Sequence, residues 1–504
     1  MLIGLFVLAP DRAPAADITV DAGGVCTLAE AIDSANNNNA NGNGCVDGVE
    51  YEDDIITLET DIVLGATLPP VTGSVILEGQ GHAIDGNDDS SIGSVLRIAA
   101  DGDLTLNEAI ITGGYADSKG GGVYNEGAVT LTNSTVSGNT ASSSGEQSLG
   151  GGIYNHNEGL VILTNSTVSG NHASQGGGIY SNYGTILVTD SAISGNTGPE
   201  DDYGGGGICS IFSRIILDRS VVSNNTAVLG GGIYNAFGSV ILTDSTIRDN
   251  TGPGDGSGYG GGIYNSNYGS VILTRSVVVG NTAVMGGGIN NISGTIMLTN
   301  STISGNYTST PVSAGSSAGG GIYNNDTVIL IHSTASRNYA STDSSSGTAK
   351  GGGIYNYGTV ILSSSIISGN RSYDAGDEVE NYGTVHADDF NLLGEKSGDN
   401  AKAFSGFAPG SSDITATSDG TDPTALSAII FPLADNGGRT MTHALVPGSP
   451  AVDLDITCST GLTTDQRGEH RPVGAGCDAG AFEGSVTSGG SKAFLPALYF
   501  LLLR

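Results

Sequence analysis

Positive charge is scarce in this sequence. Among its 504 residues, Lys and Arg together number 17 against 51 Asp and Glu, which gives a formal net charge of −34 at neutral pH. Nucleic acids and anionic membrane surfaces would repel such a chain, so the charge balance disfavours both as direct partners. The same balance permits the binding of cations and favours the solubility of a long, regular β protein.

Cysteine is also rare, with five residues in the chain. Cys26 and Cys45 lie 19 residues apart, as do Cys458 and Cys477, and each pair falls within one terminal segment. Two local disulfides are the expectation for an exported protein, although the spacing by itself leaves the pairing open. Cys209 takes the place of a tyrosine in a repeat, and we interpret it as a packing residue rather than a nucleophile.

Long apolar runs are lacking, but a short one stands at each end. Residues 1–15 combine the run MLIGLFVLAP with a small-x-small pattern at Ala13–Ala15, which predicts a secretory signal without a basic start; a buried strand is the alternative. A Ser/Gly linker and the run FLPALYFLLLR form residues 485–504. That run is too short to span a bilayer alone, so we interpret it as a sorting or attachment tail, or else as a last strand.

What the chain has in abundance is glycine, 82 residues, and much of it is periodic. GGGVYN occurs at Gly120–Asn125, and GGGIYN returns at 150, 230, 260, 319 and 351. Variants begin at 176, 205 and 286, and a decayed copy, GDEVEN, begins at 376. Self-similarity at a period of 25–33 residues indicates stacked supersecondary units rather than disorder.

Each unit has room for three short strands. From the first glycine to a closing asparagine, every intact copy spans 20 to 22 residues, enough for three strands of about five residues joined by tight bends. Equivalent residues recur in the same chain direction, so the coils should stack in parallel. We therefore predict an all-β fold, a right-handed parallel β-helix of about a dozen coils over residues 55–394.

Alternation assigns the faces of each coil. In the coil at 150 we predict that Ile153, Val161, Leu163, Val168 and Ala173 point inward. The closing asparagines should form an internal ladder, because a stacked amide can hydrogen-bond to the next one along the column. They recur in all nine intact copies, as Asn139, Asn171, Asn196, Asn225, Asn250, Asn281, Asn306, Asn338 and Asn370.

Two patterns exceed what folding requires, and the first is an outward apolar stripe. The outward position of the middle strand should be polar, as Thr130 is in the first copy. The next eight coils place apolar residues there: Ile162, Leu187, Ile216, Ile241, Ile272, Met297, Ile329 and Ile361. We hypothesise that another layer covers this stripe, either the C-terminal segment, the N-terminal helix or a partner chain. The alternative is β-propensity on a tolerated surface.

The second pattern is a row of tyrosines after the triplets, beside a corner where insertions vary from 4 to 12 residues. Such a row can stack against sugar rings, and it is our candidate ligand-binding surface. The alternative is that the tyrosines stabilise one another across strands. The row consists of Tyr124, Tyr154, Tyr180, Tyr234, Tyr264, Tyr323 and Tyr355.

The two ends differ from the repeats. Residues 16–54 should form an N-terminal cap, because Thr27–Asn36 has the apolar spacing of a short helix and an open β-stack needs its end covered. Strands are expected from about Ile55. The repeat stops near residue 395, and residues 395–484 are predicted to be a β-rich C-terminal extension.

These ends carry a family resemblance. CTLAEAIDSANNN resembles the C-S-L-R-E-A-I segment of secreted bacterial β-helix proteins, with Thr27 and Ala29 in place of Ser and Arg. GSPAVD at Gly448–Asp453 and TDQRGEHRP…CDAGAFE at Thr464–Glu483 resemble the end of the choice-of-anchor Q domain. The triplets are similar to repeats of polymorphic outer-membrane proteins, although the F-x-x-N motif is missing. The resemblance implies an exported β-helix held at the cell surface by a variable tail, and it supplies no activity.

Catalysis of the polygalacturonase type by a chain of this fold would need motifs that this sequence lacks. Parallel β-helices host polysaccharide lyases and hydrolases, but the N-T-D, G-H-G and R-I-K motifs typical of polygalacturonases are absent. Asp201 and Asp202 are the one weak candidate for Ca²⁺ binding, against the simpler reading of a solvated turn. We therefore expect a structural or adhesive surface protein with a carbohydrate-binding role and no catalysis. The alternative is a polysaccharide lyase or glycoside hydrolase of the pectin-degrading type.

Overall fold

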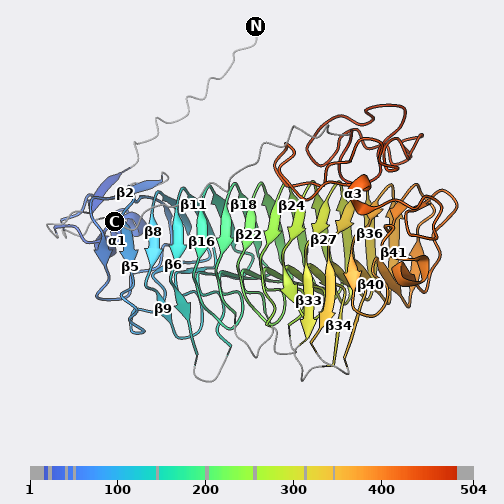
Figure 1. The fold of residues 1–504 in the computed structure, drawn as a ribbon. Coiled ribbons are helices and arrows are strands. Elements are labelled where there is room, and N and C mark those ends of the chain that lie inside the picture. Colours follow the sequence, from blue (N-terminus) through green and yellow to red (C-terminus); the bar gives the residue numbers. More distant parts are fainter. Residues whose placement is uncertain are drawn as a thin grey trace, which may run out of the picture.

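The structure is a computed structural model that describes residues 16–20, 25–39, 44–48, 53–143, 147–198, 204–253, 258–310, 315–343 and 347–484. The proposed signal, the acidic pair Asp201 and Asp202, and the proposed tail lie outside the described residues. The chain winds into a parallel β-solenoid with three long sheets and very little helix, as predicted (Figure 1).

Sheet A contains the middle strand of each coil. Its 14 strands, in spatial order, are β1 (Asp17–Val20), β2 (Asp54–Leu58), β4 (Ser74–Glu78), β7 (Asp103–Asn107), β11 (Ala128–Thr132), β15 (Leu160–Thr164), β18 (Thr185–Thr189), β21 (Arg214–Asp218), β24 (Ser239–Thr243), β27 (Gly269–Thr274), β31 (Gly294–Thr299), β36 (Thr327–Ile331), β41 (Thr359–Ser363) and β45 (Thr384–His386).

Sheet B follows sheet A in each coil. Its 14 strands are β3 (Ile62–Val63), β5 (Ala83–Asp85), β8 (Ile110–Thr112), β12 (Thr135–Ser137), β16 (Thr167–Ser169), β19 (Ala192–Ser194), β22 (Val221–Ser223), β25 (Thr246–Arg248), β28 (Val277–Val279), β32 (Thr302–Ser304), β37 (Thr334–Ser336), β42 (Ile366–Ile367), β46 (Leu392–Leu393) and β48 (Ile414–Thr415).

Sheet C contains the strand that follows each glycine triplet. Its 12 strands are β6 (Leu96–Ile98), β10 (Val123–Asn125), β14 (Ile153–Asn155), β17 (Ile179–Asn182), β20 (Ile208–Ile211), β23 (Ile233–Ala236), β26 (Ile263–Ser266), β30 (Ile289–Asn291), β35 (Ile322–Asn324), β40 (Ile354–Asn356), β44 (Val379–Asn381) and β47 (Phe404–Ser405).

The insertions between sheets B and C form three small parallel sheets of their own. They project from the lower edge of the solenoid in Figure 1, where β33 and β34 are labelled. The first pairs β9 (Tyr115–Ala116) with β13 (Thr140–Ala141), the second contains β29 (Thr282–Ala283), β33 (Tyr307–Thr310), β38 (Tyr339–Thr342) and β43 (Arg371–Ser372), and the third pairs β34 (Ser316–Ala318) with β39 (Thr348–Lys350).

The predicted inward residues form the core. Ile153, Val161, Leu163, Val168 and Ala173 are all fully buried. The register stacks like on like, because Ile153 pairs with Ile179 in the next coil and Val161 pairs with Ile186. Each coil therefore extends one continuous apolar core, and each buried aliphatic side chain contributes roughly 1.5–3 kcal/mol.

The closing asparagines form the predicted ladder at the corner between sheets B and C. The Nδ2 of Asn225, for example, donates to Oδ1 of Asn250 at 3.0 Å, and the same oxygen accepts from the backbone N–H of Asn225 at 3.0 Å. The ladder ends at Glu378, whose carboxylate accepts from Nδ2 of Asn370 at 2.6 Å. Satisfying these buried amides removes the desolvation cost of placing them inside.

Sheet A begins earlier than the sequence predicted. Strand β1 lies within the proposed N-terminal cap and pairs with β2 in parallel, because Ile18 and Val20 alternate inward and are fully buried. Helix α1 (Leu28–Asn37) follows, with a capping box between Thr27 and Glu30, and its apolar face packs onto the first coil. The predicted capping helix is therefore present, but it follows a strand of the solenoid.

The solenoid also ends later than residue 394. Strand β47 adds to sheet C with Phe404 opposite Val379, and β48 adds to sheet B with Ile414 opposite Leu392. The glycine triplet is gone from this coil, so the repeat pattern could not reveal it. A short helix, α2 (Asn400–Ala403), precedes β47.

The remaining segment, residues 416–484, folds back along the outside of the solenoid, and we call it the cover. In Figure 1 it is the red segment beside the end that contains β36 and β41. It contains helix α3 (Leu426–Ile429) and four isolated antiparallel bridges joined by turns. Within the part of the chain that the structure describes, no helix is long and apolar enough to cross a membrane.

Candidate functional site

The tyrosines of the predicted row stack on one another along the outer side of sheet C. Tyr154 and Tyr180 have ring centroids 5.6 Å apart with planes 7° from parallel. Tyr234 with Tyr264, and Tyr323 with Tyr355, show the same geometry at 5.5 and 5.4 Å. Because stacked rings occupy each other's faces, most of this column presents ring edges to a ligand.

Two residues divide the column into three groups. Cys209 stands between Tyr180 and Tyr234, and Asn290 stands between Tyr264 and Tyr323. In the first group Tyr154 and Tyr180 are buried, and burial raises the pKa of Tyr154 to about 12. These buried rings serve packing and are closed to a large ligand.

The third group differs because the two longest insertions lie beside it. Residues 307–318 and 339–350, 12 each, come directly before the coils at Gly319 and Gly351. Their strands β34 and β39 wall a cleft of about 270 Å³. We call it the tyrosine cleft, and it is lined by Met285, Ser316, Ser317, Ala318, Tyr323, Thr348, Lys350, Tyr355 and Tyr357.

Tyr357 adds a partly exposed aromatic ring to this cleft. Its ring lies at 61° to Tyr323 and at 73° to Tyr355, so it stands across the column rather than within it. It stacks on Tyr382 at 5.1 Å, and its residue is 48% exposed. The hydroxyls of Tyr355 and Tyr357 are 3.1 Å apart and share a hydrogen bond. Tyr357 was not in the predicted row; the signal for it is the second tyrosine of GGGIYNYG.

A charged pair closes one side of the cleft. Lys350 Nζ donates to Glu380 Oε1 and to the Tyr382 hydroxyl, each at 2.9 Å, and that hydroxyl donates to Glu380 at 2.6 Å. Hydrogen bonds to Tyr382 and Glu380 raise the pKa of Lys350. Burial opposes ionisation of Glu380, yet hydrogen bonds from Tyr382 and Lys350 lower its pKa below the usual value. The pair stays ionised and fixes the Lys350 ammonium at the cleft wall.

A second cleft, of about 380 Å³, lies at the C-terminal end of sheet A. Apolar Ile361 and Val385 line one part of it, and His386, Asp388 and Asp389 line another. Backbone and side-chain hydrogen bonds from Ser412 lower the pKa of Asp388. This cleft has no aromatic wall, so it lacks the feature that distinguishes the tyrosine cleft.

The candidate metal ligands are not tested by the fold, because Asp201 and Asp202 lie outside the described ranges. Among the residues that the structure does describe, no group of three or more His, Cys, Asp or Glu side chains is arranged to hold a metal ion.

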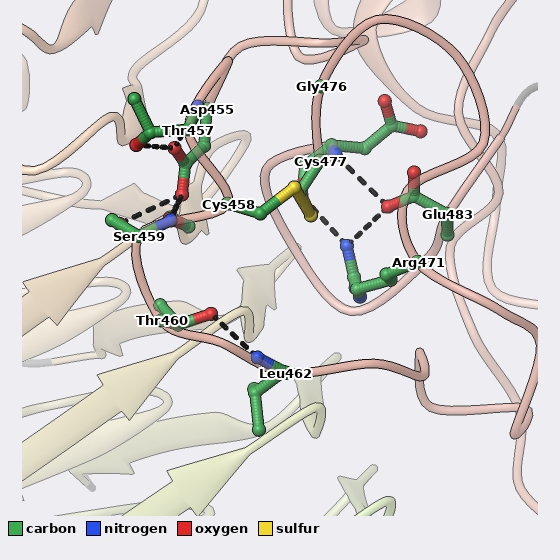
Figure 2. The surroundings of a disulfide bond; sticks show 12 residues. Asp455, Thr457, Cys458, Ser459, Thr460, Leu462, Arg471, Gly476, Cys477 and Glu483 are labelled. Atoms are coloured by element: carbon green, nitrogen blue, oxygen red, sulfur yellow. Dashed lines mark hydrogen bonds and ion pairs between the residues drawn. A yellow bond between two sulfur atoms is a disulfide. The ribbon is translucent and has the colours of Figure 1, made fainter.

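The two expected local disulfides are present. Cys26 is bonded to Cys45 and Cys458 to Cys477. Figure 2 shows the second bridge beside the Arg471–Glu483 ion pair. Cys209 is free and fully buried, and burial raises its pKa to about 12, which keeps it an unreactive thiol. Two disulfides indicate an oxidising environment, extracellular or periplasmic.

The apolar stripe lies on sheet A, away from the cover. Each of its eight residues is partly exposed. The cover instead hydrogen-bonds to sheet B and the turns before it, for example from Ala481 N–H to Thr334 Oγ1 and from Thr440 Oγ1 to the Arg275 carbonyl. The hypothesis of a layer on the stripe therefore stays a hypothesis, and we return to it below.

Comparisons with known proteins assign nothing beyond the fold that the structure itself shows. No protein-family model matches the chain, and no curated protein matches it. Among solved structures, it is similar to the crystal structure of pectate lyase Pel9A, with 13% identity over 85% of this chain and 88% of that chain and a TM-score of 0.34. This is a distant likeness of parallel β-helices, and it assigns the chain to no family.

Proposed function

We propose that this protein is a secreted, cell-surface-attached β-solenoid that binds carbohydrate in the tyrosine cleft without cleaving it. The observation that carries the proposal is the crossing of Tyr357 over the stacked Tyr323 and Tyr355, in a hollow bordered by hydroxyl side chains.

The chemistry of the lining suits a sugar. A pyranose ring has apolar C–H faces, which pack on an aromatic ring, and equatorial hydroxyls, which need donors and acceptors. The exposed ring of Tyr357 supplies the first, and Ser316, Thr348 and the Lys350 ammonium supply the second. Parallel strands hold the tyrosines rigidly, so little entropy is lost when a ligand binds.

The charge of the chain favours neutral glycans. Its net charge of −34 repels polyuronates at long range, and the single ammonium at the cleft is neutralised by Glu380. Export is supported by the two disulfides. Attachment is supported by the resemblance of the C-terminal motifs to an anchoring domain and by the apolar run at the end of the sequence.

The test is a binding and turnover assay on the purified mature chain. A panel of neutral and uronate polysaccharides is assayed with and without Ca²⁺, and we expect the neutral glycans to be retained unchanged and the polyuronates to bind more weakly. Removal of one stacking ring by Tyr357→Ala should weaken binding about tenfold or more, because a stacked ring contributes about 1–3 kcal/mol.

The matched control is Tyr268→Ala, which removes a tyrosine that is 83% exposed at the same corner of the solenoid, three coils before Tyr357 and away from the cleft. It should leave binding unchanged. Appearance of shortened or unsaturated products would instead support the lyase or hydrolase alternative. Equal loss in both variants, or no retention of any glycan, would exclude the tyrosine cleft as the binding site.

A further inference from the structure

The outer side of sheet A has an unusual composition. Strands β15, β18, β21, β24, β27, β31, β36 and β41 present three outward residues each, and we call these residues the open face. The apolar stripe forms its central row, and most residues of the two flanking rows are Ser or Thr. Two charged residues occur on it, Arg214 and Asp218, and both belong to β21. A nearly uncharged face on a chain of net charge −34 is a specific feature.

We propose that the open face is the interface of a homodimer, in which a two-fold axis runs parallel to the solenoid axis and the stripe of one copy packs on the stripe of the other. Depletion of charge around an apolar centre is the compositional mark of a protein interface.

The size of the face fits this role. Eight strands about 4.8 Å apart, each presenting three outward side chains over five residues of about 3.3 Å, make a surface of roughly 600–650 Å². A stable interface buries about 600–1,000 Å² on each partner, so the face reaches the lower end of this range and the residues at its edges add to it. Facing sheets pack about 10 Å apart, which leaves room for the aliphatic side chains to meet.

The two charges select the orientation. The chosen two-fold axis keeps both solenoids in the same direction and makes each strand face its own copy in the reverse direction. Arg214 and Asp218 flank Ile216 at equal distance. Arg214 of each copy therefore meets Asp218 of the other copy, which gives two equivalent ion pairs. A two-fold axis along the strands would reverse the order of the coils: through β21 it would set Arg214 against Arg214, and through the middle of the face it would set β21 against the uncharged β31. Asp218 also pairs with Arg219 of its own chain, and a carboxylate can accept from both.

The edges of the face are complementary in the same arrangement. One edge carries exposed rings, with Phe212 stacked on Tyr183 at 4.8 Å and on Phe237 at 4.5 Å. The other edge carries the guanidinium groups of Arg219 and Arg275, which pair with Asp190 and Asp244. The rotation brings the aromatic edge of one copy toward the arginine edge of the second copy, where rings and guanidinium groups attract.

Other candidates for this face are accounted for. The cover hydrogen-bonds to the sheet B side, from Thr440 to Gln466 and beyond. Helix α1 packs at the N-terminal end of the core. A second copy is the occupant that matches the size, the neutrality and the two charges of the open face together.

The first experiment is sedimentation of the wild-type chain and of Ile241→Asp, which places a charge at the middle of the stripe. The wild type should be a dimer at micromolar concentration and the variant a monomer. Val63→Asp is the control, since Val63 is apolar and 62% exposed on sheet B, and it should stay dimeric. Far-UV circular dichroism and thermal unfolding check that both variants fold.

The second experiment tests the orientation by charge reversal. R214D and D218R should each weaken the dimer, because each sets like charges opposite one another, and the double variant should restore it. A bismaleimide should also link Ile241→Cys to itself, as this residue lies on the proposed axis, and should link Ser239→Cys poorly. Buried Cys209 leaves no background.

Each outcome decides the proposal. A wild-type chain that is monomeric at every concentration overturns it. So does a dimer that Ile241→Asp leaves intact although the variant is folded. Failure of the double reversal to restore a dimer weakened by each single reversal overturns the proposed two-fold axis.

Discussion

The outer sides of sheets A and B differ in whether the chain covers them. Sheet A exposes a row of aliphatic side chains and is left open, whereas sheet B presents small polar residues on β32 and β37 and the apolar Ile366 and Leu392 on β42 and β46, and all of these are covered. Under the cover, Thr302, Ser304, Thr334 and Ser336 are buried. Apolar patterning therefore does not predict which face the chain covers with its own C-terminal segment.

The cover is held on sheet B by an apolar cluster, in which Ile366 and Leu392 pack with Ile430 and Leu445, and by hydrogen bonds. Ser304 Oγ bonds to His443 Nε2 at 2.9 Å, Thr302 Oγ1 donates to Gln466 Oε1 at 2.6 Å, and Ser364 Oγ donates to Asp455 Oδ2 at 3.0 Å. Small side chains allow a loop-rich segment to approach closely, and a segment without long strands needs partners for its buried polar groups. A flat aliphatic row would leave those groups unpaired.

The strongest test of the covered face is its buried ion pair. Both side chains of Arg471 and Glu483 are fully buried, and their charged atoms lie 2.7 Å apart. Arg471→Met leaves Glu483 buried and uncompensated, which should cost about 3–5 kcal/mol. Limited proteolysis should then cut within residues 416–484 while the coils survive. Arg439→Met, at a side chain that is 61% exposed in the same segment, should be resistant.

The next largest effect concerns the disulfides. Replacing Cys458 and Cys477 by Ser should destabilise the cover by about 3 kcal/mol, because the reduced chain regains loop entropy. The Cys26–Cys45 bridge closes a loop of equal length at the other end, so its removal should cost a similar amount and leave the cover docked. Cover detachment in both double variants would mean that the two ends unfold as one unit.

Substituting leucine for a polar residue on each of the two faces should change the free energy of unfolding by a smaller amount. Ser304→Leu overfills a covered site and removes the bond to His443, at a cost of about 2 kcal/mol. Thr243→Leu, at an outward position of the open face, should change the stability of the monomer by about 0.5 kcal/mol or less. Urea unfolding of both variants measures the difference, and equal losses would remove the distinction between the faces.

The last effect is a pH dependence of the cover, which grows with the pH change and is about 1.4 kcal/mol for each of the two histidines at pH 5.5. Burial lowers the pKa of His443 to about 4 and that of His332 to about 3, with Arg337 near the first and Arg471 near the second opposing protonation further. Both values lie below the unfolded value near 6.5, so their contribution is complete above pH 6.5 and is lost as the pH falls from there toward 4.

For His443 the loss should reach about 1.4 kcal/mol for each pH unit below 6.5. Thermal unfolding of the cover at pH 7 and pH 5.5 measures this loss. The variant His443→Gln keeps hydrogen-bonding capacity without titrating, and its cover should be less sensitive to pH. An identical pH response in the variant would assign the effect to other groups.

The sequence predicted the regular part of this molecule well. Like residues at like positions, such as Ile153 and Ile179, determine both the register and the inward face, and the closing asparagines could be assigned to a ladder. A second ladder, which is formed by the Asn of GGGIYN itself, was not predicted from the sequence. It runs, for example, from Asn235 to Asn265 and on to Asn291.

The coil at 376 shows why the rest was harder. Its sequence, GDEVEN, departs from the triplet and suggests decay, yet two of its three acids each end a column. Glu378 takes the last donor of the asparagine ladder, and Glu380 ends the tyrosine column at Lys350. A ladder that donates forward at every step needs an acceptor at its end. The place of the cover and the crossing of Tyr357 depend on contacts between distant segments, which no periodic pattern contains.

The central claim is that the C-terminal segment covers the outer side of sheet B and leaves the apolar stripe of sheet A free. The most direct measurement is the rate of thiol labelling of single cysteines placed at Ser304 under the cover, at Ser169 on the uncovered part of sheet B, and at Thr299 on the open face of an Ile241→Asp background. We predict that Ser304→Cys is protected while Ser169→Cys and Thr299→Cys label quickly. Rapid labelling of Ser304→Cys in the folded protein, or protection of Thr299→Cys there, would contradict the account.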